Sequence, residues 1–65
     1  MILLGIDPGT ARMGYAVLKY SSKPELIETS TIITKPELEM PQRLKVLYTN
    51  LNDVIKINKP DIIVV

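Results

Sequence analysis

The residues of this chain whose type and spacing suit chemistry lie near its N-terminus, in Asp7-Pro8-Gly9-Thr10 and the nearby Arg12. Asp7 is a lone carboxylate that directly follows the apolar residues 1–6. A carboxylate at the end of a buried strand is a suitable ligand for a divalent cation, and an arginine beside it suits a phosphate group. The same residues also suit an ordinary tight turn, in which Asp7 accepts a backbone hydrogen bond. Taken alone, they leave both interpretations open.

The composition restricts which metal and which reaction are possible. The chain has no histidine and no cysteine. Any metal must therefore be held by oxygen ligands, which favours Mg²⁺ or Mn²⁺ over zinc, and the most common general base is missing. The net charge of +1, from 8 Lys and Arg against 7 Asp and Glu, gives no strong electrostatic reason to bind nucleic acid. The chain has neither a secretory signal nor an apolar stretch near the ~20 residues of a membrane span, so a cytoplasmic location is the default expectation.

Three strands are predicted ahead of residue 36. Residues 1–6 are mostly Ile and Leu, the pattern of a strand that is buried on both faces. A turn over residues 8–13 leads into a return strand over residues 14–20, which is rich in strand-forming residues and ends at Ser21 to Pro24. Residues 25–33 alternate loosely between apolar and polar and predict a third, antiparallel strand, closed by Lys35-Pro36. Together these strands form a meander.

The hydrophobic period then changes to that of a helix. Its predicted apolar face consists of Leu44, Leu47, Tyr48, Leu51, Val54 and Ile55. Pro41 fits the first helical position, although Met40 is a poor N-cap, and Asn58-Lys59-Pro60 predicts the end. Residues 61–65 then begin a fourth strand, whose apolar and β-branched residues predict burial on both faces.

The order of these elements predicts an α/β sheet with strand order 3-2-1-4. A strand-helix-strand connection is right-handed, so the fourth strand should lie parallel to the first and beside it. The residue after Val65 would then stand next to Asp7. One helix covers only one face of this sheet, so we expect an incomplete domain whose bare face and free edge lead to self-association.

The assembled residues resemble the N-terminal part of a RuvC-type Holliday-junction resolvase, of the RNase H-like superfamily. The resemblance covers essentially all 65 residues but less than half of a typical member. The matching residues are Ile2 to Thr10 with Gly14-Tyr15-Ala16-Val17, then Ile33-Thr34, Arg43-Leu44, Tyr48 and Lys59-Pro60-Asp61.

This resemblance implies that residues 1–65 are the N-terminal part of one truncated RNase H-like nuclease domain, and that Asp7 is the first of four metal-binding catalytic acids. The second would be a glutamate directly after Val65, and the others would lie much later. The implied activity is crossover junction endodeoxyribonuclease, which cleaves four-way DNA junctions in recombination and repair. It would use two Mg²⁺ or Mn²⁺ ions, act as a homodimer and work with branch-migration proteins. The 65-residue piece itself is expected to be inactive.

Two other families share parts of this pattern. Actin-like sugar kinases and Hsp70-type ATPases also open with Asp-x-Gly-Thr and bind nucleotide phosphates there, but Pro8 removes a backbone donor that such a loop needs. YqgF-type nucleases have a comparable opening, although Tyr15-Ala16 and the helix from Arg43 to Pro60 fit RuvC better.

Four further features each have two interpretations. Thr10 either contacts a phosphate or orients Asp7, or else bonds its own backbone. Arg12 either donates two hydrogen bonds from its guanidinium to a DNA phosphate or is a solvated charge in a loop. Tyr48 is interpreted as core rather than as a base-stacking platform. Most of the scattered basic residues are interpreted as soluble surface: Lys19, Lys23, Lys35, Arg43, Lys45, Lys56 and Lys59.

Overall fold

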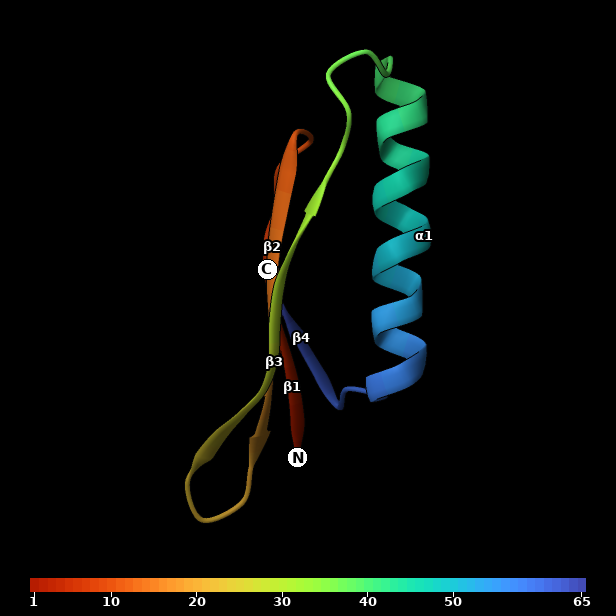
Figure 1. Cartoon of the computed structure of the whole chain (residues 1–65). Helices are drawn as coiled ribbons and strands as arrows, with labels where there is room; N and C mark the ends of the chain where they lie inside the picture. Colours follow the sequence, from red (N-terminus) through yellow and green to blue (C-terminus); the bar gives the residue numbers. More distant parts are fainter.

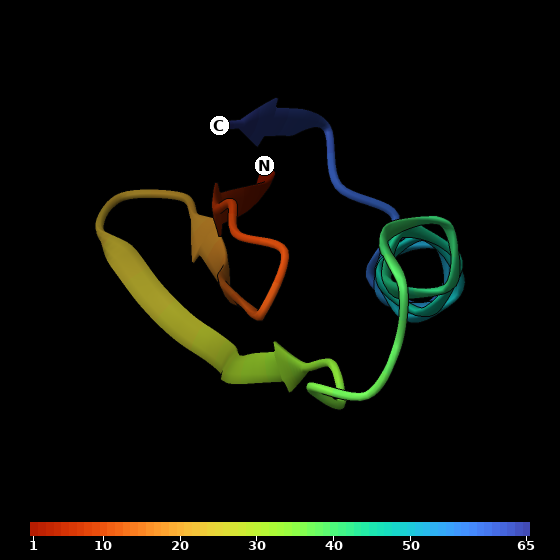
Figure 2. The same ribbon diagram turned by 90° about the horizontal axis from the view of Figure 1, so that it is seen from above.

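Four strands form one mixed sheet in the computed structural model, which describes residues 1–65, and one helix packs against a single face of it (Figures 1 and 2). The strand order is β3-β2-β1-β4, which confirms the predicted topology. The fold is therefore a two-layer α/β arrangement. In chain order its elements are β1 (Ile2–Asp7), β2 (Arg12–Tyr20), β3 (Pro24–Ile33), α1 (Met40–Asn58) and β4 (Ile62–Val64).

The first three strands form the predicted antiparallel meander. Leu4 lies opposite Val17 in the β1–β2 pair, and this register continues to the end of β1. β2 begins at Arg12, two residues before the predicted start, because Arg12 already pairs with Ile33 of β3. The β2–β3 register shifts once, between Val17 and Leu18, an irregularity of the kind that increases strand twist.

Helix α1 begins one residue earlier than predicted. Glu39 is its N-cap, and the Glu39 N–H donates to Gln42 Oε1 over 3.0 Å, which satisfies a backbone donor at the helix start. Pro41 is therefore the second helical residue, where its missing N–H again costs nothing. At the other end Lys59 adopts a left-handed conformation with φ of 49°, and its N–H donates to the Ile55 carbonyl over 2.8 Å.

The core lies between the sheet and α1 and is small. Leu4 and Val17 are fully buried, and Leu47 of the helix is 5% exposed. Only 4 of 65 residues are buried, because the molecule is long and thin, with extents of 45 × 16 × 15 Å. A domain of this length has little apolar surface to bury, so its stability depends on a few contacts.

The predicted apolar face of the helix is only partly correct. Leu47 packs against the sheet, but Leu44 is 52% exposed and Tyr48 is 70% exposed. The interpretation of Tyr48 as core is therefore wrong for this chain. Helical periodicity identifies a wide apolar stripe, whereas one sheet contacts only the part of it around Leu47.

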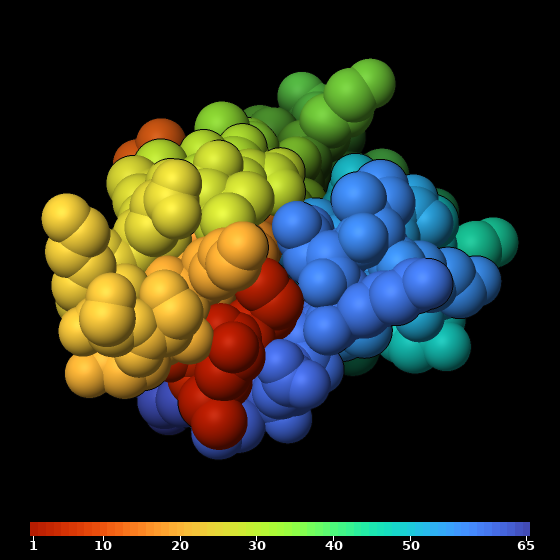
Figure 3. Space-filling view, turned by 90° about the horizontal axis from the view of Figure 1, so that it is seen from below, coloured from red at the N-terminus to blue at the C-terminus, as the bar shows by residue number.

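Strand β4 runs parallel to β1 and forms the edge of the sheet. Gly5 lies beside Val64, and all three β4 residues are exposed, so the prediction that this strand is buried on both faces is wrong for this chain. Figure 3 shows the first residues of the chain lying between the β2–β3 hairpin and the C-terminal part of the chain. The sheet face opposite α1 is uncovered, as expected, and self-association through it stays a prediction. Helix α1 is not apolar enough over its length to cross a membrane.

Candidate active site

Asp7 is the last residue of β1, and pairing with β2 fixes its backbone. It lies opposite Gly14, and a Cβ built on Gly14 would lie 3.8 Å from the Asp7 Cβ. This is ordinary van der Waals contact, so the two positions face the same side of the sheet. Gly14 thus leaves the space above the Asp7 side chain open, and the Asp7 carboxylate is exposed to solvent.

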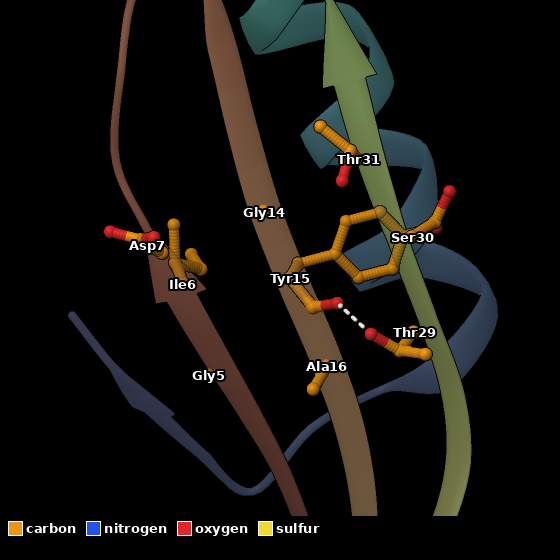
Figure 4. Close-up of a pocket in the computed structure, with 9 residues that line it drawn as sticks. All are labelled: Gly5, Ile6, Asp7, Gly14, Tyr15, Ala16, Thr29, Ser30 and Thr31. Carbon is orange, nitrogen blue, oxygen red and sulfur yellow. Dashed lines mark hydrogen bonds between the residues drawn. The ribbon is translucent and has the colours of Figure 1, made fainter.

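The uncovered sheet face beside Asp7 is hollowed. Side chains alternate along a strand, and Leu4 and Val17 point toward α1, so their neighbours Gly5 and Ala16 face the other side. With Gly14 they form the floor of an open hollow of about 420 Å³, whose rim includes Thr29 and Thr31 of β3 (Figure 4). Small residues on adjacent strands create this space.

The turn after Asp7 is tight and leaves no room for a larger residue at Gly9. A Cβ built on Gly9 would overlap the carbonyl oxygen of Arg12. Arg12 lies two residues before Gly14 in β2, so it starts on the same sheet face as Asp7, and it is exposed. Thr10 contributes its carbonyl oxygen rather than its hydroxyl to the contacts of this turn. The structure therefore places Asp7 and Arg12 at one end of the open face.

Thr34, directly after β3, and Arg43, in α1, support this turn through hydrogen bonds, a role that the sequence did not reveal. Thr34 is 4% exposed, and its Oγ1 donates to the Thr10 carbonyl over 2.6 Å. The guanidinium of Arg43 donates to three oxygens of the segment between β3 and α1. Counting Arg43 among the surface charges is therefore wrong. The sequence signal was weak, namely a Thr directly after a strand and an Arg in the first turn of a helix.

Two other acids of the chain make their hydrogen bonds away from Asp7. The Ile2 N–H donates to Asp61 Oδ2 over 2.7 Å, which places Asp61 at the opposite end of β1. Glu28 accepts hydrogen bonds from Tyr15 on β2 and Asn58 at the end of α1. No group of three or more Asp, Glu, His or Cys residues could hold a metal ion. The exposed Asp7 carboxylate has the right chemistry for a hard cation, but no group of three such ligands surrounds it.

The β1–β4 register shows where a second ligand would have to come from. Leu3 lies beside Ile62, and Gly5 lies beside Val64. Because parallel neighbours keep a constant offset, continuing this register places a residue after Val65 beside Asp7. The predicted meeting point of the two strand ends therefore agrees with the observed pairing.

Comparison with known proteins identifies similar chains. The family model described as "Crossover junction endodeoxyribonuclease RuvC" matches residues 3–65. A RuvC protein of Alkaliphilus metalliredigens is 41% identical over 66 residues, covering 100% of this chain and 40% of the relative. That of Desulforamulus reducens is 47% identical over 62 residues, covering 94% of this chain and 38% of the relative. The chain thus spans about two fifths of the length of these relatives.

Solved structures show the same fold. The structure of Thermus thermophilus RuvC matches with a TM-score of 0.88 and 22% identity, over 97% of this chain and 40% of that one. The T. thermophilus RuvC in complex with a Holliday junction substrate matches with a TM-score of 0.90 and 24% identity, with the same coverage. The sheet order and the single helix of this chain therefore match about two fifths of each of these larger chains.

Proposed function

Because the chain belongs to the RuvC family of crossover junction endodeoxyribonucleases, we propose that it forms the N-terminal part of a single RNase H-like domain that cleaves four-way DNA junctions. The observation that carries this proposal is the position of Asp7. It is exposed at the end of β1, on the open face, where a continued β4 would bring a second residue beside it.

We assign Asp7 as the first metal-binding catalytic acid. Its carboxylate oxygens suit Mg²⁺ or Mn²⁺, and a glutamate after Val65 together with later acids would complete a site for two ions. Such ions, when bound, activate a water molecule and stabilise the departing oxygen of a phosphodiester. With one acid in place, the 65-residue chain alone is not expected to cleave DNA.

Arg12 is assigned to the DNA backbone. Its guanidinium starts from the same sheet face as Asp7 and is exposed, so it can donate two parallel hydrogen bonds to a phosphate. This contact would position the DNA strand and carry no sequence information. Thr10 is assigned a weaker phosphate contact through its hydroxyl, which the turn contacts leave free while its carbonyl is engaged.

The partners follow from the family. A T. thermophilus relative was solved with a Holliday junction substrate, which supports four-way junction DNA as the ligand. Resolution needs two cuts, so a homodimer that acts with branch-migration proteins is part of the proposal. The nucleotide-binding and YqgF-type alternatives have no comparable support, because the RuvC family model matches residues 3–65.

The test uses a chimaera in which this chain replaces the matching N-terminal segment of the D. reducens relative. We expect Mg²⁺-dependent cleavage of a four-way junction, little cleavage of a linear duplex of the same sequence, and no ATP requirement. Asp7→Asn should reduce cleavage to background, and Arg12→Ala should raise the KM for the junction. Asp53→Asn is the matched control, because Asp53 is an exposed acid on α1.

Three outcomes would contradict the proposal. The first is a folded chimaera without metal-dependent cleavage. The second is full activity of the Asp7→Asn variant. The third is equal cleavage of the junction and the linear duplex.

A further inference from the structure

Thr34 holds the turn that follows Asp7 through both its backbone and its side chain. Its N–H donates to the Ala11 carbonyl over 3.0 Å, and its Oγ1 donates to the Thr10 carbonyl over 2.6 Å. Thr34 is also the one buried polar residue of the chain. Two successive carbonyls of the turn are therefore fixed by a single residue that is 24 positions away from Thr10.

Arg43 in turn fixes Thr34. Its Nε donates to the Leu38 carbonyl over 3.0 Å, its Nη2 to the Pro36 carbonyl over 3.0 Å, and its Nη1 to Thr34 Oγ1 over 3.3 Å. Thr34 Oγ1 therefore accepts from Arg43 while its own hydrogen has two carbonyl acceptors in the turn, Thr10 at 2.6 Å and Ala11 at 3.4 Å. The guanidinium thus joins the Thr34 hydroxyl to the segment between β3 and α1, and the hydroxyl joins that segment to the turn.

The Asp7 side chain makes no hydrogen bond within the chain, so its direction is set by its backbone, which pairs with Gly14 and continues directly into the turn. Before Asp7, pairing with β2 holds this backbone in the sheet. After Asp7, the hydrogen bonds from Thr34 to the Thr10 and Ala11 carbonyls hold the turn. Gly9 does not make this turn flexible, because it lies close against the Arg12 carbonyl oxygen.

We propose that Thr34 and Arg43 are positioning residues for the Asp7 site, in that their hydrogen-bonded bridge fixes the turn that sets Asp7 and Arg12 relative to each other. This inference rests on the proposed function and deepens it. It also separates the two arginines. All three guanidinium nitrogens of Arg43 donate to protein oxygens, whereas Arg12 is exposed and makes no such bond.

The test removes only the Thr34 hydroxyl, in the 65-residue chain. Thr34→Val has nearly the same shape and no donor, and Thr34→Ser keeps the donor and loses the methyl group. NMR then records the amide signals of residues 9–12, the side-chain carboxyl carbon of Asp7, and exchange of the residue 34 amide. We expect Thr34→Val to displace these signals and speed that exchange about tenfold, and Thr34→Ser to restore both.

Thr29→Val is the matched control for the spectra. It also removes a hydroxyl that donates to a carbonyl, here Tyr15 over 3.1 Å, but far from the turn. It should leave the signals of residues 9–12 in place. If Thr34→Val does not fold, Arg43→Lys replaces it, because lysine keeps the charge but cannot reach three acceptors. It should displace the same signals in the same direction.

The proposal is overturned if the folded Thr34→Val and Arg43→Lys variants keep the wild-type turn signals, or if Thr34→Ser disturbs them as much as Thr34→Val does. The second result would show that packing of the methyl group, not the hydroxyl, is what matters. In the chimaera, Thr34→Val should lower kcat and also raise the KM for junction DNA, because the turn positions both Asp7 and Arg12. The NMR result does not need cleavage, so an inactive chimaera would refute the proposed function and leave this inference to be decided by the spectra.

Discussion

Adding one glutamate after Val65 should create the beginning of a metal site. The β1–β4 register places such a residue beside Asp7, and neighbouring strands lie about 4.8 Å apart. Two unit charges 4 Å apart in water interact by about 1 kcal/mol, so a second carboxylate at that distance from a divalent ion contributes about 2 kcal/mol. We therefore expect a chain extended by Glu-Gly-Gly to bind Mn²⁺ about 30-fold more tightly than one extended by Gln-Gly-Gly.

Calorimetry or water-proton relaxation with Mn²⁺ measures this ratio directly. The Gln extension is the matched control, because it carries the same chain length and the same terminal carboxylate. Asp7→Asn combined with the Glu extension should bind no better than the Gln extension, since both carboxylates must act on one ion. Equal Mn²⁺ affinity of the Glu and Gln chains would refute the reasoning, because it would mean that the two strand ends do not meet at Asp7.

Three further predictions concern the fold and are measured by chemical or thermal unfolding at equal protein concentration. The hydrogen bond to Glu28, together with partial burial, raises the pKa of Tyr15 above its usual 10.0. The neutral phenol is thus favoured in the folded state, so its contribution is complete below pH 10 and is lost as the pH rises through the folded pKa. Tyr15→Phe should cost about 1 to 2 kcal/mol at neutral pH and remove this part of the alkaline loss, and an unchanged alkaline profile would contradict it. Lys59→Gly should stabilise the chain by about 0.5 to 1 kcal/mol, because the left-handed φ of 49° strains any residue with a Cβ, and a loss of stability would show that the Lys59 side chain contributes more than that strain costs. Gly9→Ala should cost about 2 kcal/mol through overlap with the Arg12 carbonyl, whereas Gly5→Ala, whose Cβ would lie 4.0 Å from the nearest atom, should be tolerated.

The topology was predictable because it follows from local patterns and one general rule. Strand and helix periods are visible in the sequence, and the right-handed connection of parallel strands then fixes β4 beside β1. The sequence alone therefore places Asp7 at the meeting point of two strand ends. The poor N-cap at Met40 indicated a start before Pro41, and α1 begins one residue earlier, with Glu39 as its N-cap in place of one of the usual small polar residues.

The support beneath the site was not predictable, because it joins residues that no local pattern connects. The bond from Thr34 to Thr10 spans 24 positions, and the Arg43 guanidinium contacts a loop whose path depends on where α1 packs. The helix face shows the same limit. Periodicity groups Leu47 with Tyr48, yet only packing decides that Leu47 is buried and Tyr48 is exposed. Asp7 is predictable in one respect and unpredictable in the other. Sequence pattern and topology locate its backbone, whereas long-range hydrogen bonds, which the sequence does not reveal, fix the turn on which the direction of its side chain depends.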